Sequence, residues 1–227
     1  MPRENLTLQI HLIQDELLLM GSMVEQATLQ GVQALKNRDL NAARQIYNND
    51  RLINEKRYAV ESAVLILIAT QQPMAHDLRL LAAMLEISSE LERMGDYAKG
   101  ICKVVFNLKD IELPIPVKEF EEMADKAVSM FHRALAAFVS EDYQTAKALP
   151  AEDDQVDQLF NQAQHFIILA MVEKPEILDH MNLLLWVAHN LERLADRVTN
   201  ICERTYFIAT GEFMELETEP KDLDGDA

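Results

Sequence analysis

The sequence contains two similar stretches of twelve residues that carry acidic side chains at the same positions. LERMGDYAKGIC begins at residue 91 and LERLADRVTNIC begins at residue 191. Each stretch holds a Glu and an Asp four residues apart, Glu92 with Asp96 and Glu192 with Asp196. Carboxylate oxygens are the ligands that hard cations such as Mg²⁺ and Mn²⁺ prefer. The repeated spacing therefore indicates a cation site as the first chemistry to consider.

Helix geometry places each acidic pair on one face. At 100° per residue, Glu92 and Asp96 lie about 100° and 140° around the helix from Leu91. Apolar residues form a separate stripe, and the second copy repeats both features. We therefore expect both pairs to point away from the core, on the outer face of a bundle. The expected stripes consist of Leu91, Met94, Ala98, Ile101 and Val105, and of Leu191, Leu194, Val198 and Ile201.

The second copy has further candidate ligands. His189 falls on the same strip as Glu192 and Asp196, and Asp153 and Asp157 form another pair at a spacing of four. If the helices that carry these residues are antiparallel neighbours, their acidic edges face each other. Several carboxylate oxygens with one imidazole suit Mg, Mn, Fe or, less well, Zn.

The first copy is a poorer candidate. Its matching set contains Asp50, Asn54 and Ser89 beside the first acidic pair, so an amide replaces one carboxylate and a hydroxyl replaces the imidazole. Lys99 is placed to relieve the repulsion within this pair, whereas Thr199 stands at the corresponding position of the second copy. We expect the second copy to be the better metal site.

Three classes of function agree with these motifs. The first is an adaptor that binds cations, and the second is a metal-free interaction module in which the acidic pairs only solvate a docking face. The third, a carboxylate–metal hydrolase or oxidase, needs an open ligand position in a water-excluding pocket, which outward-facing pairs do not supply. The sequence has no HExxH, Glu-x-x-His, G-x-S-x-G or Gly-rich phosphate loop, so we expect no enzyme and no organic cofactor.

The charge balance restricts the partners. The net charge of −17 repels phosphate backbones and anionic lipids, which argues against nucleic acid and favours cations or a basic protein surface. No apolar run is long enough to span a bilayer, and the start MPRENLTLQIHL lacks the apolar core of a signal peptide. Cys102 and Cys202 lie in helical patterns and are predicted to be small buried side chains. We expect a cytoplasmic protein that reaches membranes only through protein partners.

Apolar residues recur at spacings of three and four along the chain, so we predict an all-α fold of six long helices. Two similar bundles of three helices are expected over residues 1–110 and 119–211. A Pro-containing linker joins them at 111–118, and an acidic, disordered tail follows at 212–227. Trp186 is predicted to lie in the core. The expected helices are 5–37, 40–70, 73–108, 118–140, 143–172 and 175–210.

The two halves also match outside the acidic pairs. At an offset of 103, Asp39 aligns with Asp142 and Asp50 aligns with Asp153, while Pro73 aligns with Pro175 at 102. This small drift is typical of a duplicated unit with short insertions.

These motifs resemble the PhoU family of phosphate-specific transport accessory proteins. LERMGDYAKGI and LERLADRVTNI are similar to the paired signature of that family, and QPMAHDLRLL is similar to the segment that opens its third helix. The stretches from Asp50 to Asn54 and from Asp153 to Asp157 resemble the second-helix pattern. The resemblance covers roughly Leu6 to Gly211.

The resemblance implies a non-enzymatic negative regulator of phosphate uptake and phosphate-starvation signalling. Its implied partners are the subunits of a phosphate ABC transporter and a sensor histidine kinase, and it implies a homodimer. It also implies metal clusters at (Glu/Asp)-x-x-x-Asp motifs, which match Glu92, Asp96, Glu192, Asp196, Asp153 and Asp157. Asn54 departs from the motif where an Asp would complete the pair with Asp50.

Overall fold

Long helices form because breakers are rare and apolar residues repeat on one side of each segment. The computed structural model describes residues 2–108 and 111–216, and it confirms the all-α prediction. The first bundle consists of α1 (Pro2–Asn37), α2 (Leu40–Gln71) and α3 (His76–Leu108). The second consists of α4 (Val117–Ser140), α5 (Tyr143–Ala148), η1 (Leu149–Glu152), α6 (Asp153–Glu173), η2 (Pro175–Ile177) and α7 (Leu178–Thr210).

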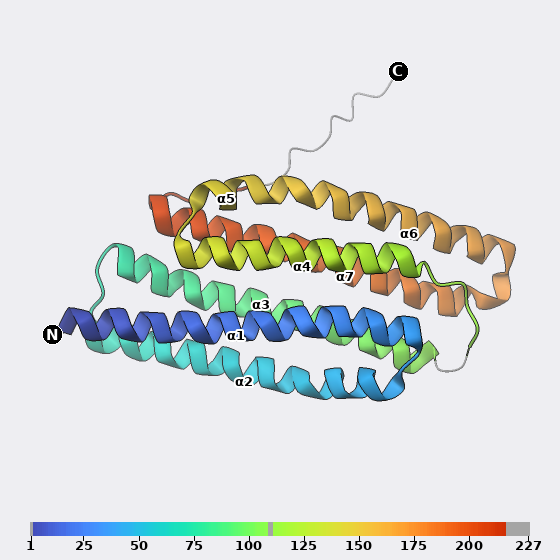
Figure 1. Cartoon of the computed structure of the whole chain (residues 1–227), viewed down its shortest axis with the longest axis horizontal. Helices are drawn as coiled ribbons and strands as arrows, with labels where there is room; N and C mark the ends of the chain where they lie inside the picture. Colours follow the sequence, from blue (N-terminus) through green and yellow to red (C-terminus); the bar gives the residue numbers. More distant parts are fainter. Residues whose placement is uncertain (1, 109–110, 217–227) are drawn as a thin grey trace, which may run out of the picture.

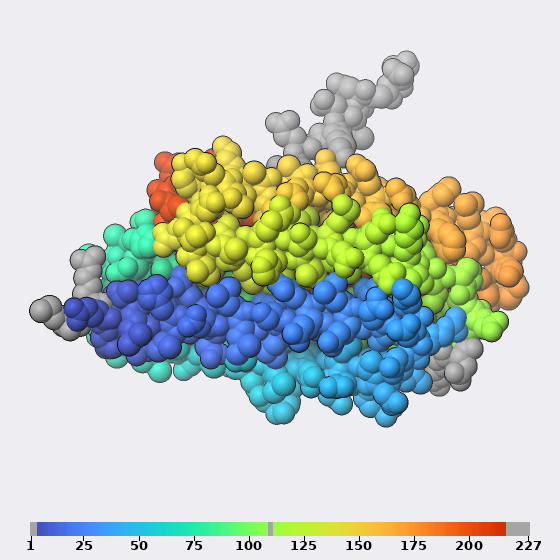
Figure 2. All heavy atoms as spheres, in the orientation of Figure 1, coloured from blue at the N-terminus to red at the C-terminus, as the bar shows by residue number. Residues whose placement is uncertain are grey.

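The helices run along the long axis of the molecule, with α1, α2 and α3 on one side and α4 to α7 on the other (Figure 1). On the face drawn in Figure 2, α1 and α4 lie side by side. The buried apolar residues of both bundles belong to one continuous core. No helix within the described ranges is both long and apolar enough to cross a membrane.

The turns confirm that the halves are equivalent. Asp39 caps α2 by accepting hydrogen bonds from two backbone amides, and Asp142 caps α5 in the same way. Each cap follows a residue in the left-handed region, Arg38 and Glu141, and each has a φ of 54°. The duplicated turn thus fixes where the second helical segment of each half begins.

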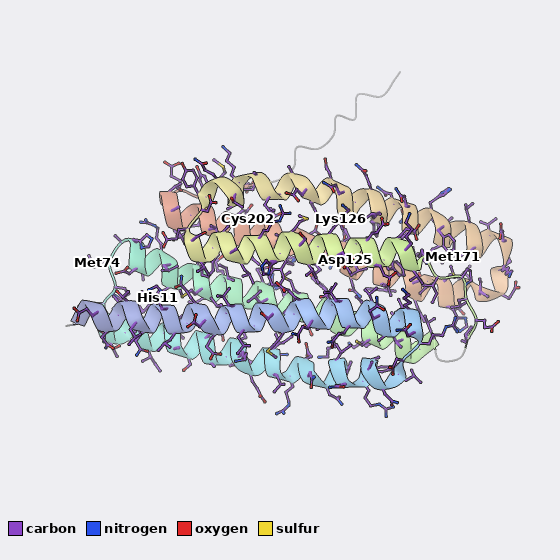
Figure 3. The ribbon with its side chains drawn as sticks, viewed as in Figure 1. His11, Met74, Asp125, Lys126, Met171 and Cys202 are labelled. Carbon is purple, nitrogen blue, oxygen red and sulfur yellow. The ribbon has the colours of Figure 1, made fainter. Side chains whose placement is uncertain are left out.

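The helix boundaries differ from the prediction at several places. Helix α1 begins at Pro2, and the segment predicted to start a helix at Pro175 forms η2, so that α7 begins at Leu178. Two further differences lie at Pro150 and at the start of α3. The helix predicted over residues 143–172 is broken by the short 3₁₀ segment η1, because Pro150 lacks a backbone N–H and restricts the residue before it. The helix predicted from Pro73 begins at His76 instead, because Gln72 adopts a left-handed conformation that caps α2. Met74 in this turn projects into solvent (Figure 3).

The first residues of the predicted tail contact α7, and the disorder expected for the tail stays a prediction. Gly211 ends α7 in a left-handed conformation with a φ of 80°, as expected. Phe213 then stacks on Phe207 with ring centroids 4.1 Å apart, and the amide of Leu216 donates a hydrogen bond to Glu203. The rest of the tail lies outside the described residues.

Trp186 was predicted to lie in the core but is 57% exposed. Its ring packs edge-on against His189 instead. Periodicity misled the prediction because Trp186 lies at the margin of the apolar stripe of α7, where a neighbouring helix does not cover it.

The core prediction can be tested at Leu194, which is fully buried on α7. Leu194→Ala should lower the free energy of unfolding by about 2–5 kcal/mol, because it leaves a cavity in a close-packed interior. Urea denaturation followed by circular dichroism measures this loss. Leu65→Ala is the control, since Leu65 is 59% exposed and its truncation should cost no more than about 0.5 kcal/mol. Equal losses in the two variants would contradict the assignment.

Candidate metal centre

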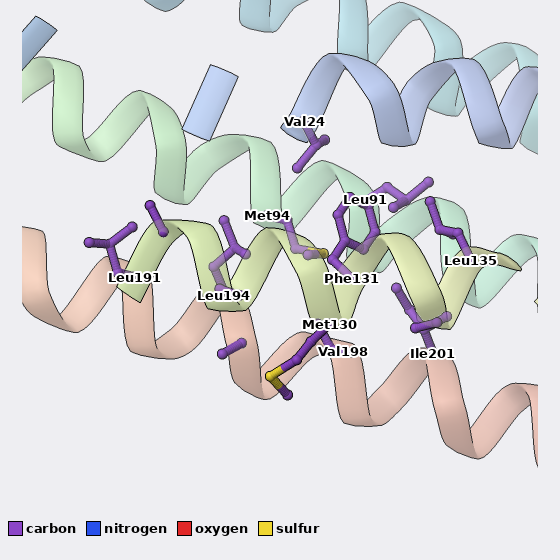
Figure 4. Packing of buried hydrophobic residues seen from close by; sticks show 14 of the residues in the cluster. Val24, Leu91, Met94, Met130, Phe131, Leu135, Leu191, Leu194, Val198 and Ile201 are labelled. Atoms are coloured by element: carbon purple, nitrogen blue, oxygen red, sulfur yellow. The ribbon is translucent and has the colours of Figure 1, made fainter. Parts of the chain in front are cut away.

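The two acidic repeats lie on the helices that join the bundles. Both predicted apolar stripes are buried, as expected, and Leu91, Met94, Leu191 and Leu194 point into the shared core (Figure 4). Residues along α3 contact residues of α7 in the opposite order, so the two helices pack antiparallel. The contacts are Arg79 with the carbonyl of Ile208, Glu86 with Arg204, Glu90 with Asn200 and Gly100 beside Asn190.

These contacts reveal a pseudo-twofold axis. The pair Glu90 and Asn200 becomes the pair Asn190 and Gly100 when each residue is replaced by its counterpart 100 positions away. The packing of α3 on α7 therefore maps one half of the chain onto the other. It leaves one acidic pair beside α2 and the other beside α6.

The carboxylates do not face open solvent, and the outer-face prediction is wrong for most of them. The side chains of Glu92 and Glu192 are only 19% and 24% exposed. Asp96 is the exception, with 54% of its side chain exposed. The prediction failed because α2 packs against α3, and α6 against α7, on the side that carries the acidic pairs. The carboxylates therefore line the seams between α2 and α3 and between α6 and α7.

The second seam brings four carboxylates close enough to perturb one another. Burial, followed by the nearby charges of Asp196, Asp157 and Glu192, raises the pKa of Asp153 to about 7. Burial and the charges of Asp196 and Asp157 likewise raise the pKa of Glu192 to about 7. Asp153 begins α6, where the helix dipole favours an anion, so burial and repulsion outweigh the dipole.

The pKa of Asp196 is also raised, chiefly by burial and then by Asp157. Arg197 and Arg193 offset part of this effect. Arg197 is directed mainly elsewhere, because its guanidinium lies 3.5 Å from Glu90 of α3. The second seam is therefore an acidic cluster whose ionisation is opposed by its own burial.

The donor atoms of the second seam fit a hard cation. Asp153 Oδ1 and Glu192 Oε2 are buried and accept no hydrogen bond, although a buried oxygen normally has a partner. His189 Nδ1 approaches Glu192 Oε2 to 3.3 Å without hydrogen-bond geometry, so the predicted imidazole does lie beside the carboxylates. A cation between these groups would supply the missing partner and the missing positive charge.

The side chains do not form a ready coordination cage. Within residues 2–108 and 111–216, no three His, Cys, Asp or Glu side chains are positioned to hold an ion. Metal binding at the eight predicted residues stays a prediction.

The first seam differs because basic side chains offset part of its charge, although burial and then the charge of Asp96 still raise the pKa of Glu92. Lys99 Nζ lies 2.5 Å from Asp50 Oδ2, and Asn54 Nδ2 donates a hydrogen bond of 3.3 Å to the same oxygen. Arg57 of α2 lies 3.7 Å from Glu92 Oε1. Lys99 was expected beside the first acidic pair, but Arg57 was not. Arg57 lies about one helical turn beyond Asn54 on α2, so extending the acidic face of this helix by one turn would have identified it.

Cysteine chemistry plays no part at either seam. Cys102 and Cys202 are buried, as predicted, and burial raises the pKa of each thiol to about 12. Cys202 lies within the second bundle (Figure 3). Both thiols are therefore protonated and serve as small apolar side chains at neutral pH.

Fold and seams together define an all-α class of protein: two tandem three-helix bundles related by a pseudo-twofold axis, each with an acidic seam. The PhoU domain model matches residues 17–105 and 120–205, one match in each bundle. The chain belongs to the PhoU family.

Similar proteins cover nearly the whole chain. A "Phosphate-specific transport system accessory protein PhoU homolog" of Borreliella burgdorferi is 35% identical over 222 residues, which are 95% of this chain and 100% of the relative. A homolog of the same name from Streptococcus pneumoniae is 32% identical over 214 residues, covering 94% of this chain and 99% of the relative.

Solved structures show the same fold. The crystal structure of the phosphate transport system regulatory protein PhoU from S. pneumoniae has a TM-score of 0.85 at 31% identity. It covers 92% of this chain and 99% of the other. PhoU from Pseudomonas aeruginosa has a TM-score of 0.85 at 27% identity, with 91% and 99% covered.

The raised pKa values predict how stability depends on pH. Asp153 binds its proton more tightly in the folded chain than in the unfolded chain. This stabilisation is fully present below the ordinary pKa of 3.8 and is lost as the pH rises through about 7. Asp153→Asn, which mimics the protonated side chain, should therefore melt higher than the wild type at pH 8. At pH 4 the difference should nearly vanish.

Thermal melts in EDTA measure this difference, with about 2–4 °C expected for each kcal/mol of relief. The matched control is Asp50→Asn in the first seam. It removes the partner of Lys99 and should lower the melting temperature at pH 8. An Asp153→Asn variant that melts below the wild type at pH 8 would contradict the account.

Proposed function

We propose that this protein is a negative regulator of phosphate uptake and of phosphate-starvation signalling. The observation that carries the proposal is full-length similarity. Both bundles match the PhoU domain, and the relatives named as phosphate-specific transport system accessory proteins align over nearly their entire lengths.

The proposed mechanism is that of an adaptor in the cytoplasm. The protein contacts a phosphate ABC transporter and a sensor histidine kinase, and it acts as a homodimer. Its net charge of −17 favours basic surfaces on these partners and opposes direct binding to anionic lipid. Binding rather than catalysis is proposed because the relatives are named as transport accessory proteins and both thiols are buried and protonated.

A cation at the second seam is the proposed ligand. Asp153, Asp157, Glu192 and Asp196 would supply oxygens, and His189 would supply an imidazole, a set that suits Mg, Mn, Fe or Zn. The bound ion would neutralise carboxylates whose ionisation burial now opposes. It would thereby stabilise the packing of α6 on α7 and the surface that these helices present.

The regulatory role can be tested by complementation. The chain is expressed in a bacterium whose own PhoU-family gene is deleted, and a phosphate-starvation reporter is measured in phosphate-rich medium. We expect repression of the reporter and slower uptake of radiolabelled phosphate than with empty vector. Co-purification of the chain with the ATPase subunit of the transporter encoded in its own genome provides the physical readout. Full reporter activity together with no co-purification would overturn the proposal.

The metal site can be tested by elemental analysis of protein purified without chelator. Glu192→Ala/Asp196→Ala should lose bound metal, because it removes two of the oxygens of the second seam. Glu92→Ala/Asp96→Ala is the matched control in the first seam and should retain metal. Equal metal in the wild type and in the Glu192→Ala/Asp196→Ala variant would refute the site assignment.

A further inference from the structure

The two seams keep the same acidic framework but differ at three positions that decide their charge. Asp50, Glu92 and Asp96 of the first seam correspond to Asp153, Glu192 and Asp196 of the second. The same offsets of 103 and 100 pair Lys99 with Thr199, Arg57 with Phe160 and Asn54 with Asp157. The first seam therefore holds these three carboxylates with Lys99 and Arg57, whereas the second holds four carboxylates without a counterpart of either cation. Arg197, at the position of Tyr97, offsets only part of the effect on Asp196.

Lys99 occupies the centre of the first seam. Its ammonium lies 2.5 Å from Asp50 of α2 and 3.7 Å from Asp96 of α3, so one positive charge bridges the two helices. It also lies 5.3 Å from the centroid of the Tyr47 ring, at a distance typical of a cation–π contact. Only 24% of the Lys99 side chain is exposed, which weakens competition from water.

Arg57 completes the neutralisation from the other end of the seam. Its guanidinium lies 3.0 Å from Glu61 and 3.7 Å from Glu92, so it joins α2 to α3 as Lys99 does. At the equivalent place in the second bundle, Phe160 packs against His189 with ring centroids 6.3 Å apart. An aromatic ring supplies packing there but no charge.

Asp50 retains one oxygen that could serve a ligand. Asp50 is 5% exposed, and its Oδ1 accepts no hydrogen bond. A pocket with a volume of about 250 Å³ lies between α1, α2 and α3, and both Asp50 and Lys99 line it. The first seam therefore has an oxygen without a hydrogen-bond partner beside a pocket, but the Lys99 ammonium already contacts the same carboxylate.

We propose that Lys99 is a built-in cation that takes the place of a metal ion in the first bundle, so that only the second bundle responds to divalent cations. This inference builds on the proposed metal site of the second seam. It assigns the two halves different tasks. The stability of the first bundle does not depend on the concentration of divalent cations, whereas the stability of the second bundle does.

The first test transfers the built-in cation to the second seam. Thr199→Lys should raise the melting temperature in EDTA by about 2–4 °C or more, because an ammonium would then neutralise Asp153 and Asp196. It should also abolish the further rise that Mn²⁺ gives the wild type. Thr199→Gln is the control, since it has similar bulk without charge, and it should do neither.

The second test replaces residues of the first seam by those at the equivalent positions of the second seam. Lys99→Thr/Asn54→Asp should melt below the wild type in EDTA and should recover when Mn²⁺ is added. Isothermal titration with Mn²⁺ should show one additional bound ion per chain. Lys99→Thr alone should show the loss in EDTA with weaker recovery, and circular dichroism reports whether each variant is folded.

The outcomes separate this inference from the proposed metal site. If Mn²⁺ binds neither the wild type nor the Lys99→Thr/Asn54→Asp variant, the metal interpretation fails for both seams. If the wild type binds Mn²⁺ at the second seam but Thr199→Lys leaves that binding unchanged, the proposal that a lysine replaces the metal ion is refuted. The proposed metal site of the second seam is then retained. A wild-type chain that binds Mn²⁺ equally at both seams would also overturn the inference.

Discussion

The antiparallel packing of α3 on α7 is the contact on which the rest of the structure depends. The apolar stripes of the two repeated stretches meet there and merge the bundles into one core. Since the same face of each helix is used, the acidic flanks are turned toward α2 in one half and toward α6 in the other. The fold therefore creates two equivalent seams, and any difference between them must come from individual side chains.

That difference is electrostatic. Burying carboxylates in a helix seam is unfavourable unless a cation or hydrogen-bond donors compensate them. Lys99 and Arg57 compensate the first seam from within the chain, whereas Asp153 and Glu192 of the second seam have raised pKa values and buried oxygens without partners. We therefore propose that the second seam binds an external cation, whereas Lys99 and Arg57 take that role in the first seam.

Local signals in the sequence predicted most of the fold. The caps at Asp39 and Asp142 bond to amides within three residues, so they could have been predicted from the local sequence without tertiary structure. The break at Pro150 could also have been predicted, because it follows from the missing amide. The exposure of Trp186 and the burial of the carboxylates could not, because they depend on which neighbour covers the flank of a helix. Periodicity identifies the centre of an apolar stripe, but it does not show how much of the helix surface on either side of the stripe neighbouring helices bury.

The most direct measurement of the central claim is a crystal structure of the protein soaked in Mn²⁺, with an anomalous difference map. The account predicts a peak in the seam between α6 and α7, within bonding distance of oxygens of Asp153, Glu192 or Asp196. It predicts none between α2 and α3, where the Lys99 ammonium stays beside Asp50. A peak in the first seam, or none in the second, would contradict it.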